Sequence, residues 1–225
     1  MGVSKKPGPK PQGKVKIKWS PNFAYAIGLL ASDGCLYNNG RHISLTTKDL
    51  EQATNFKECL GLTVKIGRKG SGASKEKKYY HVQFGDVLFV EFLKSIGIGS
   101  RKSKTIAEVK IPKKYFWDYT RGYFDGDGSS YSYWDKRWNA SFMYYISFTS
   151  ASSQYINWLR SEISERIGVN GHISIATKKL CYQLKYAKRE SNQVIHHMYY
   201  DKSVMCLKRK RLKLEACLAI VGVKL

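Results

Sequence analysis

The sequence predicts an α+β protein made of two tandem repeats, each with the element order α-β-β-α-β-β-α. Three landmarks of the first half recur in the same order in the second half: GLLASDG (28–34) as GYFDGDG (122–128), ISLTT (43–47) as ISFTS (146–150), and YYHVQFGD (79–86) as CYQLKYAK (181–188). Their offsets are 94, 103 and 102 residues. Because order, spacing and residue type agree, the sequence indicates an internal duplication.

The elements of the first repeat can be placed one by one. Ser20 and Pro21 predict the start of a helix, as N-cap and first helical residue. The turn at Asn38–Gly40 precedes the alternating stretch RHISLT, as in a hairpin. The remaining elements are expected in this order: a helix over 49–60, strands over 62–66 and 78–85, and a helix over 87–96.

Three regions are expected along the chain: a basic flexible tail over 1–18, an N-terminal repeat over 19–110, and a C-terminal repeat over 111–225 that closes with a basic helix. The tail has six lysines, three prolines and no acid, a composition typical of solvated segments. The change of offset from 94 to 103 places a nine-residue extension in the second hairpin, within 131–144. The sequence assigns this extension no role.

The composition indicates a globular protein with a polyanionic partner. Of 225 residues, 43% are hydrophobic, and 39 Lys and Arg against 17 Asp and Glu give a net charge of +22. Such a charge favours a polyanion but does not by itself separate DNA from RNA or from a membrane surface. No apolar run reaches the roughly 20 residues of a membrane helix. The five cysteines are odd in number and lack metal-finger spacing, so we expect free thiols in an intracellular compartment, cytoplasmic or organellar.

Each repeat ends its first helix with the same residue types. Gly28 and Gly122 are equivalent, and glycine inside a helix costs about 1 kcal/mol relative to alanine, so we expect another backbone to come close there. If the two helices pack about a pseudo-twofold axis, Asp33 and Asp127 emerge together, and two adjacent carboxylates favour divalent cations. Asp125 has no carboxylate counterpart, so we expect it to bond helix-end or backbone groups.

The segments AIGLLASDG (26–34) and TRGYFDGDG (120–128) resemble the signature of the LAGLIDADG homing endonucleases, in the single-chain form with two repeats. The stretches IGIGSRKSKT (96–105) and MYYDKSVMCLKRKRLK (198–213) look like those that follow the repeats in that family. The resemblance covers nearly the whole folded chain. It implies two lobes, each with a saddle-shaped antiparallel sheet that lies in the DNA major groove, and signature helices at the lobe interface.

The resemblance also implies a metal site. Asp33 and Asp127, with the backbone of Gly34 and Gly128, would bind Mg²⁺, and each acid would serve the cleavage of one DNA strand. Mn²⁺ is expected to substitute, and Ca²⁺ to support binding without cleavage. The product would be a double-strand break with short 3′ overhangs.

A basic residue is expected beside each acid, again because of the resemblance. The candidates are Lys102 after the first repeat and Lys208 or Lys210 after the second. These lysines could equally neutralise flanking phosphates, so their role stays open at this point.

Alternation along the strands predicts which side chains face the DNA. If Ile43 and Leu45 face the helices, the residues between and beside them face the other way. Polar and basic side chains on that side suit base edges and phosphates. The predicted DNA-facing residues are His42, Ser44, Thr46, Arg68, Tyr79, His81 and Gln83 in the first repeat, and Ser129, Tyr131, Ser147, Thr149, Gln183 and Lys185 in the second.

The sequence therefore predicts a monomeric, Mg²⁺-dependent, site-specific endonuclease for double-stranded DNA, with a long asymmetric target because the two halves differ at most outward positions. Two alternatives on the same fold stay open: a maturase that binds intron RNA, and a DNA-binding regulator that does not cleave. Retention of both Asp33 and Asp127 favours cleavage. No Cys or Ser opens the chain and no His-Asn pair closes it, which favours a free-standing, intron-encoded protein over an intein.

Overall fold

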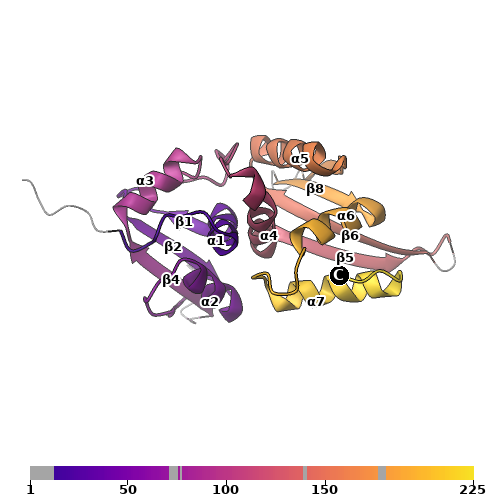
Figure 1. Cartoon of the computed structure of the whole chain (residues 1–225), viewed down its shortest axis with the longest axis horizontal. Coiled ribbons are helices and arrows are strands. Elements are labelled where there is room, and N and C mark those ends of the chain that lie inside the picture. The colour runs from indigo at the N-terminus through magenta and orange to yellow at the C-terminus, as the bar shows by residue number, and fades with distance from the viewer. Residues whose placement is uncertain (1–12, 71–75, 77, 139–140, 177–180) are drawn as a thin grey trace, which may run out of the picture.

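Two four-stranded antiparallel sheets stand on either side of a central pair of helices (Figure 1). The computed structural model describes residues 13–70, 76, 78–138, 141–176 and 181–225. The first lobe contains α1 (Pro21–Ser32), β1 (Gly34–Leu36), β2 (His42–Thr47), α2 (Leu50–Cys59), β3 (Gly67–Lys69), β4 (Tyr79–Gly85) and α3 (Val87–Ser95). The second contains the 3₁₀ turn η1 (Lys113–Tyr115), α4 (Phe116–Asp127), β5 (Gly128–Trp134), β6 (Phe142–Ser150), α5 (Ser153–Ile167), β7 (His172–Ala176), β8 (Cys181–Ala187), α6 (Lys188–Met198) and α7 (Lys208–Ile220).

The predicted α+β class and the element order of both repeats are confirmed. The strand orders β1-β2-β4-β3 and β5-β6-β8-β7 are equivalent, and every neighbouring pair is antiparallel. The duplication read from the sequence is therefore a duplication of the fold.

The helices of the first lobe begin where polar side chains cap them. Ser20 Oγ accepts the Phe23 N–H at 3.1 Å, with Pro21 as the first helical residue. Asp49 accepts a backbone N–H in the first turn of α2, and Asp86 does the same for α3. These caps fix the predicted helices over 49–60 and 87–96 to within about one residue of their observed bounds.

The strand predicted over 62–66 is wrong. The backbone N–H of Leu62 donates to Lys57 O at 3.0 Å, and Gly61 has a φ of +63°, so the chain is still closing the end of α2 at this point. Pairing with β4 starts at Gly67 and extends only to Lys69. The apolar alternation of 62–66 reflects packing against the core rather than a place in the sheet.

Part of the predicted flexible tail is held against the first lobe. The N–H groups of Lys14 and Val15 donate to Asp86 Oδ2 at 2.6 and 2.9 Å, and the Val15 side chain is buried. Residues 1–12 lie outside the described residues, so the prediction for them is not addressed. Asp86 therefore both caps α3 and anchors the segment that leads into α1.

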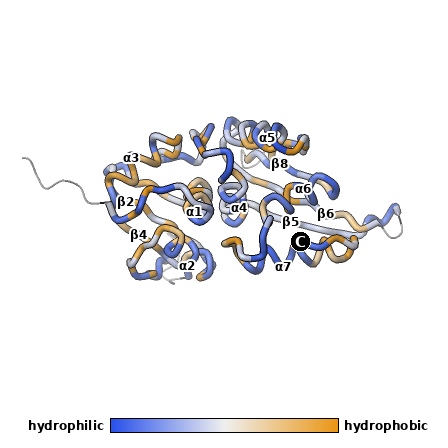
Figure 2. The backbone as a smooth tube through the Cα atoms, in the orientation of Figure 1, coloured by the Kyte–Doolittle hydropathy of each residue, from blue (hydrophilic) through white to orange (hydrophobic). Residues whose placement is uncertain are grey.

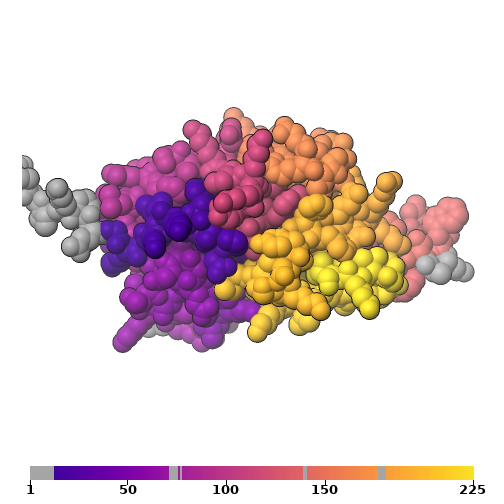
Figure 3. Space-filling view, viewed as in Figure 1, coloured from indigo at the N-terminus to yellow at the C-terminus, as the bar shows by residue number. Residues whose placement is uncertain are grey.

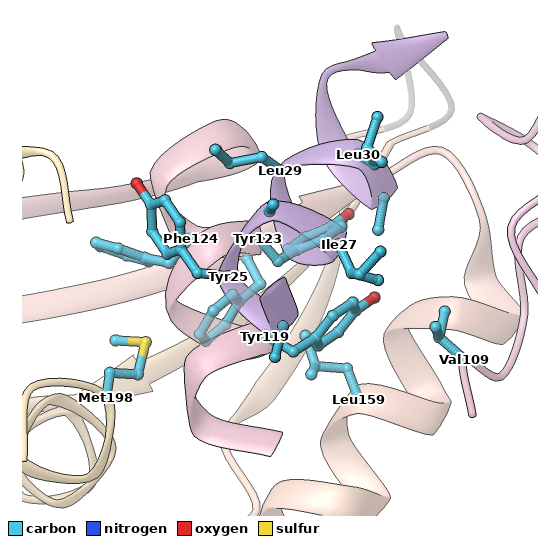
Figure 4. Packing of buried hydrophobic residues seen from close by; sticks show 14 of the residues in the cluster. Tyr25, Ile27, Leu29, Leu30, Val109, Tyr119, Tyr123, Phe124, Leu159 and Met198 are labelled. Atoms are coloured by element: carbon cyan, nitrogen blue, oxygen red, sulfur yellow. The ribbon is translucent and has the colours of Figure 1, made fainter. Parts of the chain in front are cut away.

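The α1 and α4 helices are in close contact along their length. A Cβ built on Gly28 would lie 2.1 Å from Tyr119 O, and one built on Gly122 would lie 2.0 Å from Tyr25 O. The expectation that another backbone comes close at both glycines is confirmed. Figure 4 shows large side chains of both helices, such as Phe124, packed around this contact.

Because α1 packs on its own sheet and on α4, it is buried on nearly all sides. Every residue from Phe23 to Ala31 is buried, and Figure 2 shows α1 among the hydrophobic segments in the middle of the molecule. Within the described part of the chain, no helix is long and apolar enough to cross a membrane.

Candidate functional site

The last turns of α1 and α4 bring two carboxylates together. Asp33 is the C-cap of α1 and Asp127 is the last residue of α4. A Cβ on Gly126 would lie 1.9 Å from Ser32 Oγ and 3.2 Å from Asp33 Oδ2, so only glycine at this position lets the two helix ends meet. The close packing at the glycines thus places both acids at one end of the helix pair.

The surroundings of the two carboxylates disfavour their ionised forms. Partial removal of water around Asp127 raises its pKa to about 6, and the negative charge of Asp33 adds to the increase, although Asp127 stays exposed to solvent. Loss of solvation also raises the pKa of Asp33, offset by the hydrogen bond from Gln52 and by the charges of Lys210 and Lys102. A cation between them would relieve this cost.

A lysine sits at each helix end: Lys102 is buried and Lys210 is half-buried. Lys102, 6% exposed, donates from Nζ to Ser32 O at 3.0 Å and to Gly34 O at 2.7 Å. Lys210 donates from Nζ to Phe124 O at 2.6 Å and to Gly128 O at 2.7 Å. The free carbonyls at a helix C-terminus attract cations, so both ammonium groups are fixed beside the acids.

Burial lowers the pKa of both lysines, and the acids around them counteract this. For Lys210 the result is a pKa of about 8, with Asp125 as the main opposing charge. For Lys102 the direction is also downward, and Asp127 and Asp33 oppose it. The Lys208 side chain, by contrast, is exposed, and its backbone N–H donates to Glu51. The structure thus brings Lys102 and Lys210 to the acids and leaves Lys208 on the surface.

Gln52 is a site residue that sequence reasoning did not find. Its Nε2 donates to Asp33 Oδ2 at 2.6 Å, and its Oε1 accepts from Thr47 Oγ1 at 2.7 Å, so both ends of the amide are fixed. Gln52 stands three residues after the N-cap Asp49, where a glutamine ordinarily turns back to the cap. The only signal in the sequence therefore predicted a capping role.

Asp125 bonds the groups expected of it. Its Oδ2 accepts from the Leu207 N–H and from Tyr25 OH, both at 2.7 Å, which confirms the predicted backbone role. Its Oδ1 is buried without a partner, and loss of solvation raises the pKa of Asp125 to about 6. Since Leu207 immediately precedes α7, this carboxyl fixes the start of the helix that carries Lys210.

A buried arginine holds the same segment from the other side. Arg121 donates to Met198 O at 2.5 Å and Met205 O at 2.8 Å, and pairs with Asp118 at 2.7 Å. The chain between α6 and α7 is therefore anchored to α4 at both ends of the loop. These contacts hold the start of α7 beside α4, and they thereby bring Lys210 to the site although it lies far from both acids in the sequence.

The face of each sheet opposite the helices carries the polar side chains that alternation predicted. In the first lobe Thr46 Oγ1 lies 2.8 Å from His81 Nδ1, and His81 Nε2 lies 3.0 Å from Gln83 Oε1. In the second, the strand pairing aligns Ser129, Ser147, Lys185 and His172 in one row across all four strands. We call this side of each sheet the open face.

Not every predicted DNA-facing residue is equally accessible. Ser44 and Ser147 lie on the open faces, on the inner strands β2 and β6, and each is only 3% exposed. Arg68 pairs with Tyr80, on the helix side of its sheet, where it stacks on the Tyr80 ring at 3.9 Å. Its neighbour Lys69 takes the open face instead.

The other predicted residues fall on the open faces, together with some that were not predicted. His42, Tyr79 and Tyr131 are half-buried or exposed there, as are the partners Thr149 and Gln183. The open-face residues missed from the sequence are Lys69, Tyr133, Tyr145, His172 and Ser174. The stretch HISI at 172–175 alternates polar and apolar residues as HISL at 42–45 does, so alternation could have placed His172 and Ser174 on the open face.

A small cleft gives access to Asp127. It has a volume of about 210 Å³ and is lined by Ser32, Lys102, Ser103, Tyr123, Asp127 and Thr149, among others. Among the described residues, no group of three or more His, Cys, Asp or Glu side chains could hold a metal by itself. The donor set therefore fits a hard cation that takes two carboxylates from the protein and its remaining oxygens from water and a phosphate, as Mg²⁺ does.

The two backbone oxygens expected to bind the metal ion already have a hydrogen-bond partner. Gly34 O and Gly128 O each accept a hydrogen bond from a lysine ammonium group. A carbonyl oxygen has two lone pairs, so one remains for a cation in each case.

Comparisons with known proteins identify the fold. No protein-family model and no curated protein matches the sequence. Among solved structures, I-SmaMI bound to an uncleaved DNA target with calcium ions matches with a TM-score of 0.59 at 12% identity, over 91% of this chain and 91% of that chain. The I-LtrWI LAGLIDADG homing endonuclease bound to target DNA matches with a TM-score of 0.56 at 11% identity, over 86% and 87%.

The fold is that of the LAGLIDADG homing endonucleases. The resemblance seen in the two signature segments is thereby confirmed for the fold. Full-length DUF199/WhiA from Thermatoga maritima shares the LAGLIDADG fold with this chain at a TM-score of 0.55 and 14% identity, over 90% of this chain. This chain spans 61% of the length of that protein.

Proposed function

We propose that this chain is a site-specific endonuclease for double-stranded DNA that hydrolyses phosphodiester bonds with the help of a divalent metal ion. The observation that carries the proposal is the pair of carboxylates, Asp33 and Asp127, each with the ammonium group of a buried or half-buried lysine beside it. Raised carboxyl pKa values are typical of functional sites, and Asp127 lines an accessible cleft. DNA binding alone requires no such pair.

The residues of the site have separate tasks in this proposal. Asp33 and Asp127 hold Mg²⁺, which, when bound, would polarise the phosphodiester and lower the pKa of a water molecule. Gln52 fixes the orientation of the Asp33 carboxylate. Lys102 and Lys210 place positive charge next to the scissile phosphates, where charge develops during hydrolysis.

The substrate follows from the open faces. Their polar side chains suit base edges in the major groove, and a net charge of +22 favours a polyanion. Structures of similar fold are bound to target DNA, which supports the same partner for this chain. Because the open faces of the two lobes carry different residues on a single chain, the target is asymmetric and a monomer suffices.

Selection from a randomised duplex library tests the function. The protein is incubated with the library in Mg²⁺, and in parallel in Mn²⁺ and Ca²⁺, and the DNA ends are sequenced. We expect paired ends with short 3′ overhangs at one long asymmetric sequence in Mg²⁺ and Mn²⁺, and binding without ends in Ca²⁺. A sequence that is bound but never cut in any metal would contradict the nuclease and indicate a regulator, and binding to intron RNA alone would indicate a maturase.

A further inference from the structure

The hairpin β5–β6 is longer than its counterpart in the first lobe. At the offset of 94 residues, β1 corresponds to residues 128–130, but β5 continues to Trp134. Likewise β6 begins at Phe142, three residues before the equivalent of the first residue of β2. Four additional residues at about 3.3 Å each lengthen this hairpin by about 13 Å.

The added length projects beyond the rest of the molecule. Figure 1 shows β5 and β6 running past α6 and α7, and Figure 3 shows the same hairpin as a protrusion at the right-hand end. Lys213 of α7 donates to Ser130 O, so α7 runs beside the base of the added length. On the helix side of the outer part Phe142 and Tyr144 are buried, whereas the open face of the same strands stays exposed at Tyr131 and Tyr133.

Three tyrosines stack along the open face of this outer part. Tyr131 pairs with Tyr145 across the strands, and Tyr133 follows Tyr131 on the same side. The rings of Tyr131 and Tyr145 lie 4.8 Å apart at 7°, and those of Tyr133 and Tyr145 lie 6.3 Å apart at 9°. Tyr131 and Tyr133 are 42% and 44% exposed. We call these three residues the tyrosine ladder.

The tyrosine ladder continues the surface that the proposed function assigns to DNA. Ser129, two residues before Tyr131, belongs to the open-face row that includes Lys185. At the tip, Lys136 is exposed, and the acid Asp135 is already paired with Arg137 at 2.9 Å. The surroundings are thus positive or neutral, which matches a phosphate backbone better than an acidic or purely apolar partner.

The chemistry of the ladder also fits a duplex. Tyrosine hydroxyl groups donate hydrogen bonds to phosphate oxygens, and such contacts fix position without reading sequence. The rings are already ordered by stacking on one another, so little side-chain freedom is lost on binding. An ordered row of exposed donors on a protruding arm is suited to the DNA just beyond the region that the sheet itself covers.

We propose that the tyrosine ladder extends the DNA contact of the second lobe outward, so that the second half of the target is longer than the first. An extension of about 13 Å corresponds to about four base pairs at 3.4 Å each. The proposal rests on the DNA binding assigned above. It does not require cleavage, since it concerns only how far the contact reaches.

Hydroxyl-radical footprinting of the full chain in Ca²⁺ on the selected target tests this. The variant Tyr131→Ser/Tyr133→Ser is expected to lose protection of about four base pairs at one end only, with the inner protection retained. Trp134→Ser, which removes a more exposed aromatic side chain (57%) from the opposite face of the same strand, is the matched control and is expected to keep the full footprint.

The outcomes separate this proposal from the proposed function. An unchanged footprint for the double tyrosine variant, or the same loss for Trp134→Ser, would overturn the role of the ladder while leaving DNA binding intact. If the wild-type chain protects no duplex at all, the proposed function fails and the ladder proposal fails with it.

Discussion

Lys102 and Lys210 contact equivalent positions at the ends of the two signature helices, α1 and α4. Their ammonium groups contact equivalent carbonyl oxygens: those of Ser32 and Gly34 for Lys102, and those of Gly126 and Gly128 for Lys210. The first lysine comes from the loop after α3 and the second from the helix α7, so the two reach their carbonyl groups from different types of element. The pseudo-twofold relation therefore includes the basic residues beside the acids as well as the helices themselves.

Removal of either lysine charge beside the acids is expected to slow cleavage. Lys210→Gln and Lys102→Gln take a cation away from the phosphate and should lower the single-turnover rate by about 10²-fold at saturating DNA. Lys208→Gln removes the same charge two residues away, on the surface, and should leave that rate nearly unchanged. A larger effect of Lys208→Gln than of Lys210→Gln would show that Lys208, and not Lys210, is the lysine that serves the second site.

Alanine at either signature glycine is expected to destabilise the protein. A methyl group at Gly28 or Gly122 would meet a backbone carbonyl carbon or oxygen of the partner helix, and overpacking of this kind costs about 1–3 kcal/mol. The melting temperature should fall by about 5 °C or more. Gly99→Ala is the control, because its Cβ would meet nothing within 4 Å. Equal melting temperatures for all three variants would contradict the close helix contact.

Gln52→Ala is expected to affect one strand more than the other. It removes the hydrogen bond that lowers the pKa of Asp33 and orients its carboxylate. The equivalent position in the second lobe is Tyr155, which bonds Tyr119 and leaves Asp127 without such support. Nicked DNA should therefore accumulate, cut only on the strand that Asp127 serves. Gel analysis with each strand labelled in turn measures this, and equal slowing of both strands would contradict it.

The raised pKa of Asp127 predicts a pH-dependent stability. Its value of about 6 exceeds the ordinary 3.8, so the folded state disfavours the ionised carboxyl. Stability contributed by this group is present below pH 4, is lost as the pH rises to 6, and stays absent above. Without metal, Asp127→Asn should thus raise the melting temperature at pH 8 and leave it nearly unchanged at pH 4, as thermal unfolding followed by circular dichroism would show. The opposite order would contradict the shift.

The same shift sets an acid limit for metal binding. Because protonated Asp127 is a poor ligand, Ca²⁺-dependent DNA binding and Mg²⁺-dependent cleavage should both decrease as the pH falls through about 6.

Much of the fold was accessible from the sequence because it depends on local patterns. Polar caps such as Asp49 set the helix starts, and alternation around Ile43 set the faces of the central strands. The glycines of the signature helices predicted the close contact, since no local reason favours glycine inside a helix. The failure over 62–66 arose because the closing turn of α2 uses apolar residues that resemble a strand.

The sequence predicts directly only those site residues that recur in both repeats. Asp33 and Asp127 stand out as a repeated pair, but Gln52 has no counterpart in the second repeat and its local context indicates a cap. The choice between Lys208 and Lys210 depends on the start of α7, which tertiary bonds to Asp125 fix and no local pattern indicates. The roles that the sequence alone does not decide belong to residues whose positions depend on long-range contacts.

Strand-resolved cleavage of the selected target by Asp33→Asn and Asp127→Asn tests most directly whether the paired carboxylates are catalytic. Both variants keep the shape of the helix ends and remove one negative charge each. We expect each to abolish double-strand breaks in Mg²⁺, while affinity for the target in Ca²⁺ stays within about tenfold of wild type. Undiminished double-strand cleavage by either variant would contradict the assignment of that acid, and undiminished cleavage by both would place the active site elsewhere.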